Sequence, residues 1–425
     1  GGHSPNYTGI TLGVPPQELR RSYGLMMSAA EDEKQAMLES LFNQAGKQTR
    51  SLDLVKDWTL DWPDPLATAT WAEATTPEGT AALELLRGRV ALKRRLGGLA
   101  RYSMAYHYGF TKNQFPKIAA VINEPAQLTA SDHAELRRLA AWLAYDMNAV
   151  DTFPYGTGFH LNNPNMTIMA TEARVKSSLL VKDHPQMQAW GERTVALMRA
   201  FFERYTRGSG ATYENPHYTL GVTYDWAAET SELLRANGFG DALDSPLFSR
   251  SVRFTMDWLT PPDLRFKGSR VILPLGNGSY QSVPPSVAKR LVSYFMDKDP
   301  KLAGEFQWVA NQTLPEKDRV ALVPDQVPPL TSVAYADYGV SLRHGFGTPY
   351  ETLFYLMAGN CHGHYELEQD QLSYTLYAKG QPISLHFGNG YFPIFNRPWL
   401  RNRVSLDHRR QVSERRDPRL ARVSF

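Results

Sequence analysis

The sequence predicts a multidomain α+β protein in which a helical N-terminal part is followed by a strand-rich C-terminal part. Amphipathic patterns at helical spacing fill most of the chain before position 324. Short runs rich in Tyr, Val, Thr and Leu, separated by turns that contain glycine, fill the chain after position 329. A Pro-Asp-Gln-Val-Pro-Pro segment typical of a linker lies between them. We therefore predict a helical domain at 1–323 and a sheet domain at 330–425.

The helical part is expected to contain successive amphipathic helices of similar length. In the first of them, Met37, Leu38 and Leu41 share one face, and Thr129-Ala-Ser-Asp132 later resembles a capping box. No sequence repeat is legible. Because the helices are amphipathic and of similar length, we expect stacked helix pairs, as in a helical toroid or solenoid. Helices are expected at 29–46, 78–107, 129–143, 165–181, 186–206, 225–236, 245–258, 285–297 and 301–312.

The C-terminal part is expected to form a sheet of short strands. Each run alternates or clusters β-branched and aromatic residues and ends at a turn with Gly, Pro or Asn. The arginine-rich end of the chain, 409–422, is expected to be a solvated tail. Strands are expected at 332–343, 350–358, 372–379, 383–387 and 403–408.

Length and composition limit the class of protein further. The 425 residues are too many for one ordinary core, and 42% hydrophobic with 21% charged residues is typical of globular proteins. A formal charge of +3 gives no case for nucleic-acid binding, and there is no apolar run of about 18 residues that would span a membrane. Cys361 is the only cysteine, which excludes an intrachain disulfide.

The stretch 359–391 carries the most chemical information. His362 and His364 are two residues apart before a strand-like run, and His386 ends the next run. Two strands joined by a Lys-Gly-Gln-Pro turn would bring these imidazoles together. Imidazole nitrogens are common zinc ligands, so the spacing is compatible with a zinc site. The simpler interpretation is three polar positions on a sheet.

This stretch resembles the signature of the heparinase II/III-like polysaccharide lyases, in which a Gly-His-x-His element precedes a Leu-Ser-Phe-x-Leu-Tyr-Ala-x-Gly-x-Pro strand pair and a Gly-x-Gly-x-Tyr turn. The matching residues are His362, His364, Leu372, Ser373, Tyr374, Leu376, Tyr377, Ala378, Gly380, Pro382, Gly388, Gly390 and Tyr391. The resemblance implies an incomplete α/α toroid followed by an antiparallel β-sandwich. Because only 330–425 follow the linker, we expect a reduced or truncated sandwich.

The resemblance also implies cleavage of an acidic, uronic-acid-containing polysaccharide by β-elimination, in a secreted or periplasmic protein. The chain opens Gly-Gly-His-Ser-Pro, so we expect any export signal to lie outside it. β-Elimination requires neutralisation of the uronate carboxylate, a base for the C5 proton and an acid for the leaving O4 oxygen. Asn or His⁺ suits the first task, and Tyr or His suits the other two.

The loop 155–165 is the first candidate source of these groups. The family has Asn-Asn-His or Asn-Asn-Trp at such a turn, and its Asn contacts the carboxylate. We assign this role to Asn163, with Asn162 as the alternative, and place His160 beside the substrate. Pro164 departs from the family pattern. The simpler interpretation is a helix cap followed by Pro in the first turn.

The loop 210–224 is the second candidate source. Its Glu-Asn-Pro-His-Tyr order resembles a Gly-x-x-x-Glu-x-Pro-x-Tyr element of the family, whose late Tyr transfers the proton. Tyr218 is the match, and Tyr213 and Tyr224 are held in reserve. A free phenol has a pKa near ~10, so a Tyr base needs positive charge nearby. The simpler interpretation is that these rings pack between helices.

The sheet domain is expected to supply the remaining groups. The resemblance assigns His362 to catalysis and His364 to a structural zinc ion, with His386 where the family usually has an Asp ligand. Arg401 stands where the third ligand is expected, so His408 takes that role or the site stays empty. Without zinc, His364 and His386 would be buried hydrogen-bonding residues. Tyr391 and Arg397 are expected to contact the sugar acid.

Two other functions remain open. A toroid glycoside hydrolase needs two carboxylic acids across the scissile bond. Asp225, Glu214 and Asp151 are available, but the sequence does not pair them. A noncatalytic protein that binds acidic glycans would also fit the departures at Pro164 and Arg401.

Overall fold

The computed structural model describes residues 115–122, 164–358 except 213, 277 and 337, 372–385, and single positions at 129, 130, 137, 140, 141, 144, 147, 148 and 402. The chain divides into two compact units. One consists of Met198–Glu232 and Asp241–Phe425, and the other of Gly2–Leu197 and Leu233–Gly240. The first unit thus contains helices and strands together. The domain limits 1–323 and 330–425 remain a prediction.

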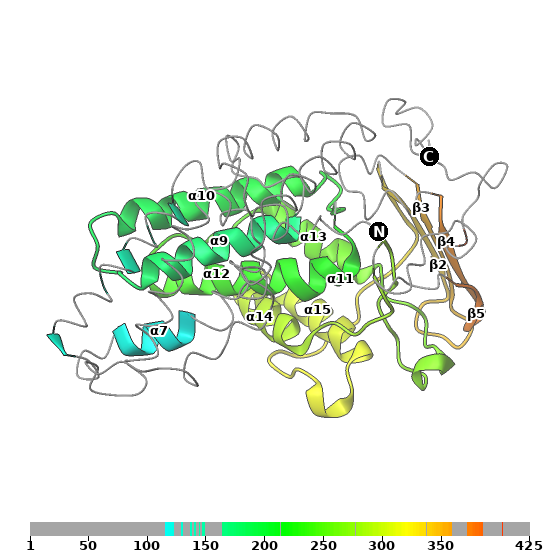
Figure 1. The fold of residues 1–425 in the computed structure, drawn as a ribbon. Coiled ribbons are helices and arrows are strands. Elements are labelled where there is room, and N and C mark those ends of the chain that lie inside the picture. Colours follow the sequence, from blue (N-terminus) through cyan, green and yellow to red (C-terminus); the bar gives the residue numbers. More distant parts are fainter. Residues whose placement is uncertain are drawn as a thin grey trace, which may run out of the picture. The chain divides into compact units, whose positions relative to one another are not determined.

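The helices of the described residues follow the predicted pattern from position 164 onward. Those expected at 165–181, 186–206, 225–236, 245–258, 285–297 and 301–312 are confirmed to within a few residues, whereas those at 29–46 and 78–107 lie outside the described residues. The helices (Figure 1) are α7 (Phe115–Ile122), α9 (Pro164–Leu179), α10 (Met187–Tyr205), α11 (Pro216–Tyr218), α12 (Tyr224–Ala236), α13 (Pro246–Met256), α14 (Pro285–Phe295) and α15 (Pro300–Thr313), with short 3₁₀ turns at Leu264–Phe266 and Glu316–Asp318. None of these helices is both long and apolar enough to cross a membrane.

In the second unit, α9 is buried along almost its whole length. Its polar side chains therefore need partners inside the protein. Lys176 forms an ion pair of 2.7 Å with Glu172, one turn away, and its ammonium lies over the Phe115 ring of α7 at 5.6 Å. The Nε atom of Arg174 donates to the carbonyl oxygen of Met147 over 3.0 Å. These partners allow a helix with charged residues to lie in the interior.

Local sequence signals explain where the helices of the first unit begin. Helices α13, α14 and α15 each begin with a proline, which lacks the N–H that a first turn leaves unpaired. The Ser245 hydroxyl caps α13 by accepting from Leu247 N over 3.2 Å, and Asp299 caps α15 by accepting from Leu302 N over 3.0 Å. Helices α14 and α15 then pack against each other through their apolar faces.

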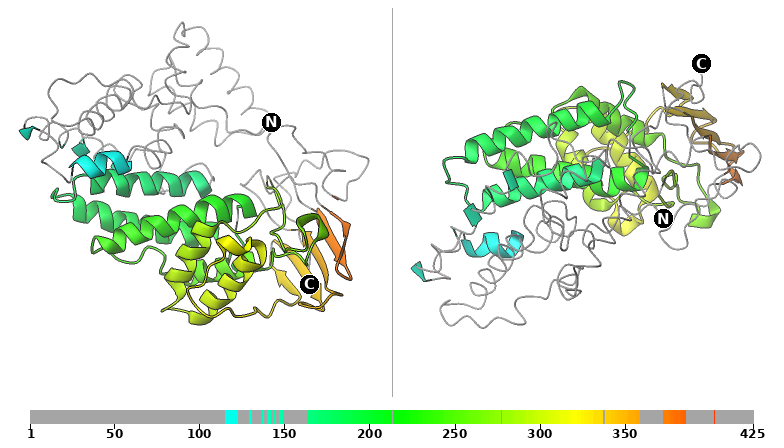
Figure 2. Two further views of the ribbon diagram at one scale, coloured as in Figure 1. Left: turned by 90° about the horizontal axis from the view of Figure 1, so that it is seen from below. Right: turned by 45° about the horizontal axis from the view of Figure 1, so that its top comes forward.

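The strands form one antiparallel sheet with the order β1-β2-β3-β4-β5, which is also the order along the chain. Its strands are β1 (Val333–Tyr335), β2 (Gly339–His344), β3 (Thr352–Met357), β4 (Tyr374–Ala378) and β5 (Gln381–Ser384). In both views of Figure 2, the strands lie side by side next to the yellow helices α14 and α15. The α+β class is therefore confirmed. The described strands form a single sheet. The strand expected at 403–408 lies outside the described residues.

The strand expected at 332–343 is in fact two strands. Tyr338 N donates to the Tyr335 carbonyl over 3.0 Å, which closes a turn between β1 and β2. Gly339 follows with φ of +155°, and a Cβ there would lie 2.1 Å from the Leu356 carbonyl oxygen. Glycine is required at this position because β3 approaches so closely.

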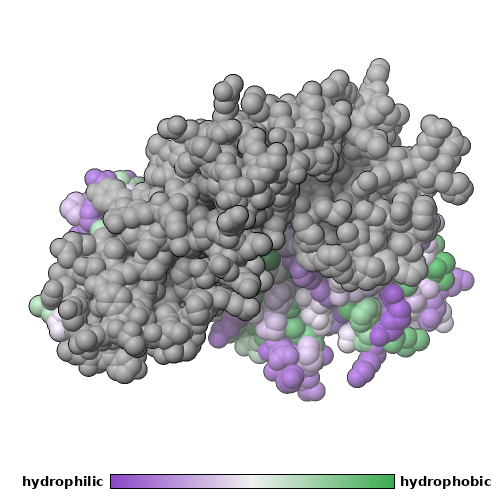
Figure 3. All heavy atoms as spheres, in the orientation of Figure 1, coloured by the Kyte–Doolittle hydropathy of each residue, from purple (hydrophilic) through white to green (hydrophobic). Residues whose placement is uncertain are grey.

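One face of the sheet is buried against α13 and the segment that follows it. Side chains alternate along β3, so that Leu353, Tyr355 and Met357 are buried. The Phe254 ring of α13 contacts the Tyr335 ring at 4.7 Å between centroids. Trp258 donates from its indole nitrogen to the Tyr355 hydroxyl over 3.0 Å. On the part of the surface that Figure 3 shows in colour, hydrophilic and hydrophobic residues are interspersed.

The proline-rich segment 324–329 has no regular structure, as a linker would, but it is held on α15. Asp325 accepts from the Gln307 amide over 2.7 Å, and Gln326 N donates to the Gly304 carbonyl over 3.1 Å. A Cβ at Gly304 would lie 2.8 Å from the Pro324 carbonyl oxygen, so glycine permits this approach. The segment therefore leads from the helices to the sheet along a fixed path.

Candidate functional site

The candidate site lies at the turn that carries Tyr218. The chain leaves α10, forms a β-bridge between Thr206 and Thr212, and reaches the first residue of α11, Pro216, four residues later. Gly210 makes the bend with φ of +94°, and a Cβ there would lie 2.5 Å from the Arg250 carbonyl oxygen. A glycine is therefore needed for the chain to turn back toward α11.

Buried polar groups fix the backbone of this turn. The Asn215 side chain is fully buried and accepts from Tyr218 N over 3.0 Å, which makes it the N-cap of α11. Glu214 is also buried, and its carboxylate accepts from Asn215 N over 3.1 Å. The Glu214 carbonyl accepts from the hydroxyls of Thr212 and Thr219 over 3.1 and 3.2 Å. The backbone that carries Tyr218 is therefore held on both sides.

A π-helical turn, Thr219–Thr223, joins α11 to α12 without a break. Such a turn holds one more residue than an α-helical turn, so it displaces the side chains before it relative to those after it. Single π-turns occur frequently at functional sites, because the insertion costs stability and persists where the displaced side chain is useful. The π-turn here begins directly after Tyr218.

Tyr218 and Tyr224, at the two ends of this turn, differ in environment. Tyr224 is buried, its hydroxyl donates to Ser251 Oγ over 2.8 Å, and burial raises its pKa well above the usual value. Tyr224 is therefore a structural residue. Tyr218 is half-buried, and the structure gives its hydroxyl no hydrogen-bond partner among the described residues. Tyr213, the other reserve, lies outside the described residues.

His217 is exposed beside Tyr218. The two rings meet edge to face, with centroids 5.2 Å apart and an interplanar angle of 79°. The Nδ1 atom of His217 lies 2.8 Å from Oε1 of Gln281, a residue 64 positions away in the chain. Neither His217 nor Gln281 was predicted as a site residue, although the Glu-Asn-Pro-His-Tyr order marks the segment as a candidate. No local signal links the two residues.

The carboxylates near this turn are engaged in structural contacts. Glu214 is buried and accepts from the backbone, as described above. The Asp225 carboxylate lies 3.1 Å from Nη1 of Arg290, whose Nη1 also lies 3.0 Å from Glu229. Asp151 lies outside the described residues. The two described acids thus do not form the exposed pair that a glycoside hydrolase needs.

Of the predicted site residues, Tyr218 is the one that the structure describes. The predicted residues outside the described part of the chain are His160, Asn162, Asn163, His362, His364, His386, Tyr391, Arg397 and His408. Pro164 is the first residue of α9, which agrees with the simpler interpretation of a proline in a first helical turn. Among the described residues, no group of three or more His, Cys, Asp or Glu side chains is placed to hold a metal ion.

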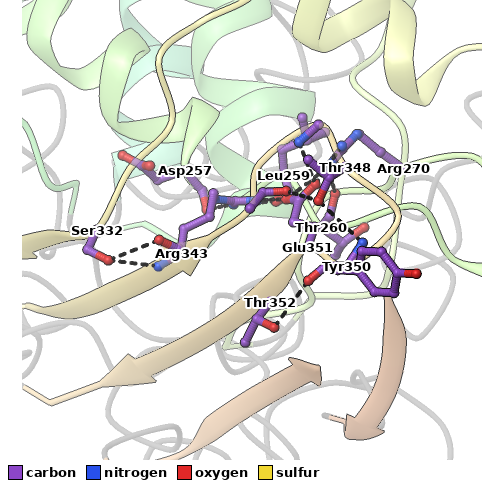
Figure 4. Close-up of polar contacts among 12 residues, drawn as sticks. Asp257, Leu259, Thr260, Arg270, Ser332, Arg343, Thr348, Tyr350, Glu351 and Thr352 are labelled. Atoms are coloured by element: carbon purple, nitrogen blue, oxygen red, sulfur yellow. Dashed lines mark hydrogen bonds and ion pairs between the residues drawn. The ribbon is translucent and has the colours of Figure 1, made fainter. Parts of the chain in front are cut away.

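A second polar cluster lies between the sheet and the segment after α13. The Glu351 carboxylate pairs with Nη1 of Arg343 through one oxygen and with Nη2 of Arg270 through the other, the latter at 2.7 Å. The two guanidinium groups also donate to the carbonyl oxygens of Leu259 and Thr260, over 2.6 and 2.9 Å. Figure 4 shows Glu351 lying between these partners. All three charged side chains are buried, so the cluster joins the sheet to the helical segment.

Several titratable groups in and beside this second cluster have shifted pKa values. Burial raises the pKa of Asp257 to about 6, although a hydrogen bond from Tyr335 and the charge of Arg343 oppose this. Burial and the neighbouring Asp257 raise the pKa of Tyr335, and burial lowers that of Arg343. Each of these groups contacts another, which identifies them as part of the structural cluster.

Tyr377, one of the residues in the Leu-Tyr-Ala motif on which the resemblance rests, also has a structural role. Its hydroxyl donates to Asp263 over 2.9 Å and accepts from Arg265 over 3.1 Å. Arg265 in turn pairs with Asp263 at 2.6 Å and stacks over the Tyr280 ring at 4.6 Å. Tyr377 therefore connects β4 to the turn that follows α13 through hydrogen bonds.

Comparison with known proteins supports the fold alone. No protein-family model and no curated protein matches the chain. The fold is similar to that of a heparinase III with methylated lysines, at 11% identity, 85% coverage of this chain and 54% of the other, and a TM-score of 0.52. A mutant of the heparan sulfate lyase HepC from Pedobacter heparinus is similar at 13% identity, 86% and 56% coverage, and a TM-score of 0.54. The chain spans about half the length of these two structures.

These similarities define the class: the chain has an α+β fold of the kind found in heparinase III and heparan sulfate lyase structures. At such low identity they establish no family membership and no shared residue roles.

Proposed function

We propose that this chain is a polysaccharide lyase that cleaves a uronic-acid-containing polysaccharide by β-elimination, with Tyr218 as a proton-transfer residue. The observation that carries the proposal is the position of Tyr218. Its backbone is fixed by the buried Asn215 cap, and its half-buried phenol has no hydrogen-bond partner within the described part of the chain. The fold similarity to heparinase III structures supports the same class of reaction.

The proposed chemistry divides three tasks among residues of this chain. Asn163, or Asn162 in its place, hydrogen-bonds the uronate carboxylate, so that the C5 proton becomes acidic enough to be removed. Tyr218 takes that proton or protonates the departing O4 oxygen, and His362 performs the complementary transfer. His160, Tyr391 and Arg397 bind the sugar acid. The assignment of Tyr218 rests on the resemblance and on the structure of its turn, and the other assignments rest on the sequence alone.

The proposal includes an incomplete α/α toroid, a reduced β-sandwich and a secreted or periplasmic location. His364, His386 and His408 are the proposed holders of a structural zinc ion. Three imidazoles are a chemically suitable donor set for zinc. Such an ion would stabilise the sheet domain, and no step of the reaction is assigned to it.

The test is a substitution of Tyr218 by phenylalanine. Elimination leaves an unsaturated uronate that absorbs in the ultraviolet, so lyase activity is followed by absorbance on heparan sulfate, alginate and other polyuronates. Tyr218→Phe is expected to lower the rate by about a hundredfold or more, since general acid–base groups contribute at least that much. Binding of the glycan, measured by calorimetry, is expected to change little.

Tyr350→Phe is the matched control, because Tyr350 is 72% exposed and lies outside the candidate site. It is expected to keep full activity. If Tyr218→Phe also keeps full activity, Tyr218 is not the proton-transfer residue. New reducing ends without absorbance would indicate a hydrolase. Tight binding of acidic glycans without any cleavage would indicate a noncatalytic binding protein.

A further inference from the structure

We propose that His217 is a further substrate-binding residue beside Tyr218, that it hydrogen-bonds an anionic group of the glycan, and that Gln281 is the positioning residue that orients it. This inference rests on the proposed function and extends it to a specific contact. Its evidence is independent of the sequence resemblance, because it comes from the packing of two segments that are distant in the chain.

The imidazole of His217 is held in one orientation. The hydrogen bond between Nδ1 of His217 and Oε1 of Gln281 is 2.8 Å long, which is a normal length. It uses one ring nitrogen inside the protein. In the described residues, Nε2 has no partner, and the side chain is exposed. One ring nitrogen is therefore held by the protein, and the other is left for a ligand.

Gln281, the residue that orients the ring, is itself fixed in position. Gln281 pairs with Ile272 in a β-bridge, and its carbonyl accepts from Ile272 N over 2.8 Å. The next residue, Ser282, donates from its hydroxyl to the Thr313 carbonyl of α15 over 2.6 Å. Val283 N donates to the Thr313 hydroxyl over 3.0 Å. The position of Gln281 is thus set by two other segments rather than by a mobile loop.

The backbone at Gly278 lies close to the turn that carries His217. Gly278 is buried, and a Cβ there would lie 3.0 Å from the Leu275 carbonyl oxygen and 3.5 Å from Cβ of His217. The absence of a side chain lets the loop 276–281 come close enough for Gln281 to reach His217. A hydrogen bond between an exposed histidine and a neutral amide adds little stability, so a role in fixing the ring is the better explanation.

The hydrogen-bonding group that His217 presents determines which ligands it can bind. With Nδ1 of His217 against the Gln281 oxygen, the imidazolium form presents Nε2 as a charged N–H donor, which suits a carboxylate or a sulfate oxygen. The edge-to-face contact with the Tyr218 ring places this donor next to the proposed proton-transfer group. A carboxylate and a sulfate share this chemistry. Alginate carries only carboxylates and heparan sulfate carries both. Comparing the two substrates therefore shows whether His217 binds a carboxylate or a sulfate.

The test combines steady-state kinetics with a double-mutant cycle. His217→Ala is expected to raise KM by about tenfold, the equivalent of one charge-assisted hydrogen bond, while kcat falls less than about threefold. His217→Arg is expected to recover most of the loss, because it restores a cationic donor. Gln281→Ala is expected to raise KM by a smaller factor, and the double variant is expected to match His217→Ala.

His344→Ala is the matched control, since His344 is an exposed histidine on β2. The inference is overturned if His217→Ala behaves like His344→Ala, or if His217→Ala lowers kcat and leaves KM unchanged. If the fold-changes in KM caused by His217→Ala and Gln281→Ala multiply in the double variant, Gln281 does not act through His217.

Failure of the proposed function has a different signature. In that case the unmodified protein gives no unsaturated product with any glycan. The same variants are then compared by calorimetry with heparan sulfate and alginate. Weaker binding in His217→Ala, but not in His344→Ala, supports the anion-binding role without the lyase reaction, and equal binding in both overturns it.

Discussion

The Tyr218 turn and the Glu351 cluster are both rich in polar groups, but they use them in opposite ways. In the cluster, Glu351 pairs with Arg343 and Arg270, and all three side chains are buried. In the turn, the buried groups hold the backbone. Nε2 of His217 and the hydroxyl of Tyr218 have no hydrogen-bond partner among the described residues. The first arrangement joins two parts of the fold, and the second leaves groups available for a ligand.

This difference limits what shifted pKa values reveal about function. Strong shifts are often a sign of an active site. Here the raised pKa values of Asp257 and Tyr335 belong to the packing of the sheet on the helical segment. Their first cause is burial, and their partners are one another. In this protein, unused donors and acceptors at a rigid surface turn are the better guide to the site.

The largest expected effect comes from breaking the Glu351 cluster. Glu351→Gln removes the negative charge and leaves Arg343 and Arg270 buried without it. The free energy of unfolding is expected to fall by about 3–5 kcal/mol, as measured by urea denaturation. Glu316→Gln, at an exposed position in the 3₁₀ turn after α15, is expected to change it by less than about 0.5 kcal/mol. Equal denaturation midpoints for the two variants would show that the cluster contributes little.

The next effect is a pH dependence that originates at Asp257. Its pKa is about 6 in the folded protein and about 3.9 in an unfolded chain, so the folded state binds the extra proton between these values. The contribution of this group to stability is therefore full below about pH 4 and is lost as the pH rises through about 6. Relative to Asp257→Asn, the unmodified protein should gain up to about 3 kcal/mol between pH 7 and pH 4.

The measurement is urea denaturation of both proteins across this pH range, with Asp297→Asn as the control at an exposed position. A difference between the unmodified protein and Asp257→Asn that does not vary with pH would contradict the prediction. A loss of stability of the unmodified protein relative to Asp257→Asn as the pH falls from 7 to 4 would show that the predicted direction is wrong.

The smallest effect concerns the close approach at the Tyr218 turn. Gly278→Ala places a Cβ 3.0 Å from the Leu275 carbonyl oxygen, so the loop that carries Gln281 must shift by a few tenths of an ångström. Stability is expected to fall by about 1 kcal/mol, and KM for the glycan is expected to rise because His217 loses its fixed partner. Gly221→Ala, in the π-turn, meets nothing within 4 Å and is expected to leave stability equal or slightly higher.

Local signals explain the parts of the fold that the sequence predicted. Proline at the first helical position and Ser245 or Asp299 at the cap mark helix starts that the structure confirms. The break between β1 and β2 also had a signal, since Gly339 interrupts a run of strand-forming residues, but the run was interpreted as one strand. Tyr218 was selected by resemblance, and the structure adds the buried cap that holds it.

The periodicity, the caps and the alternation along strands were determined by the sequence itself, because each depends on residues a few positions apart. The tertiary structure alone decided the pairing of Arg343 and Arg270 with Glu351, and of His217 with Gln281 across 64 positions. Such contacts depend on how whole elements pack. A histidine followed by a tyrosine in the sequence says nothing about which ring nitrogen the protein holds and which it leaves for a ligand.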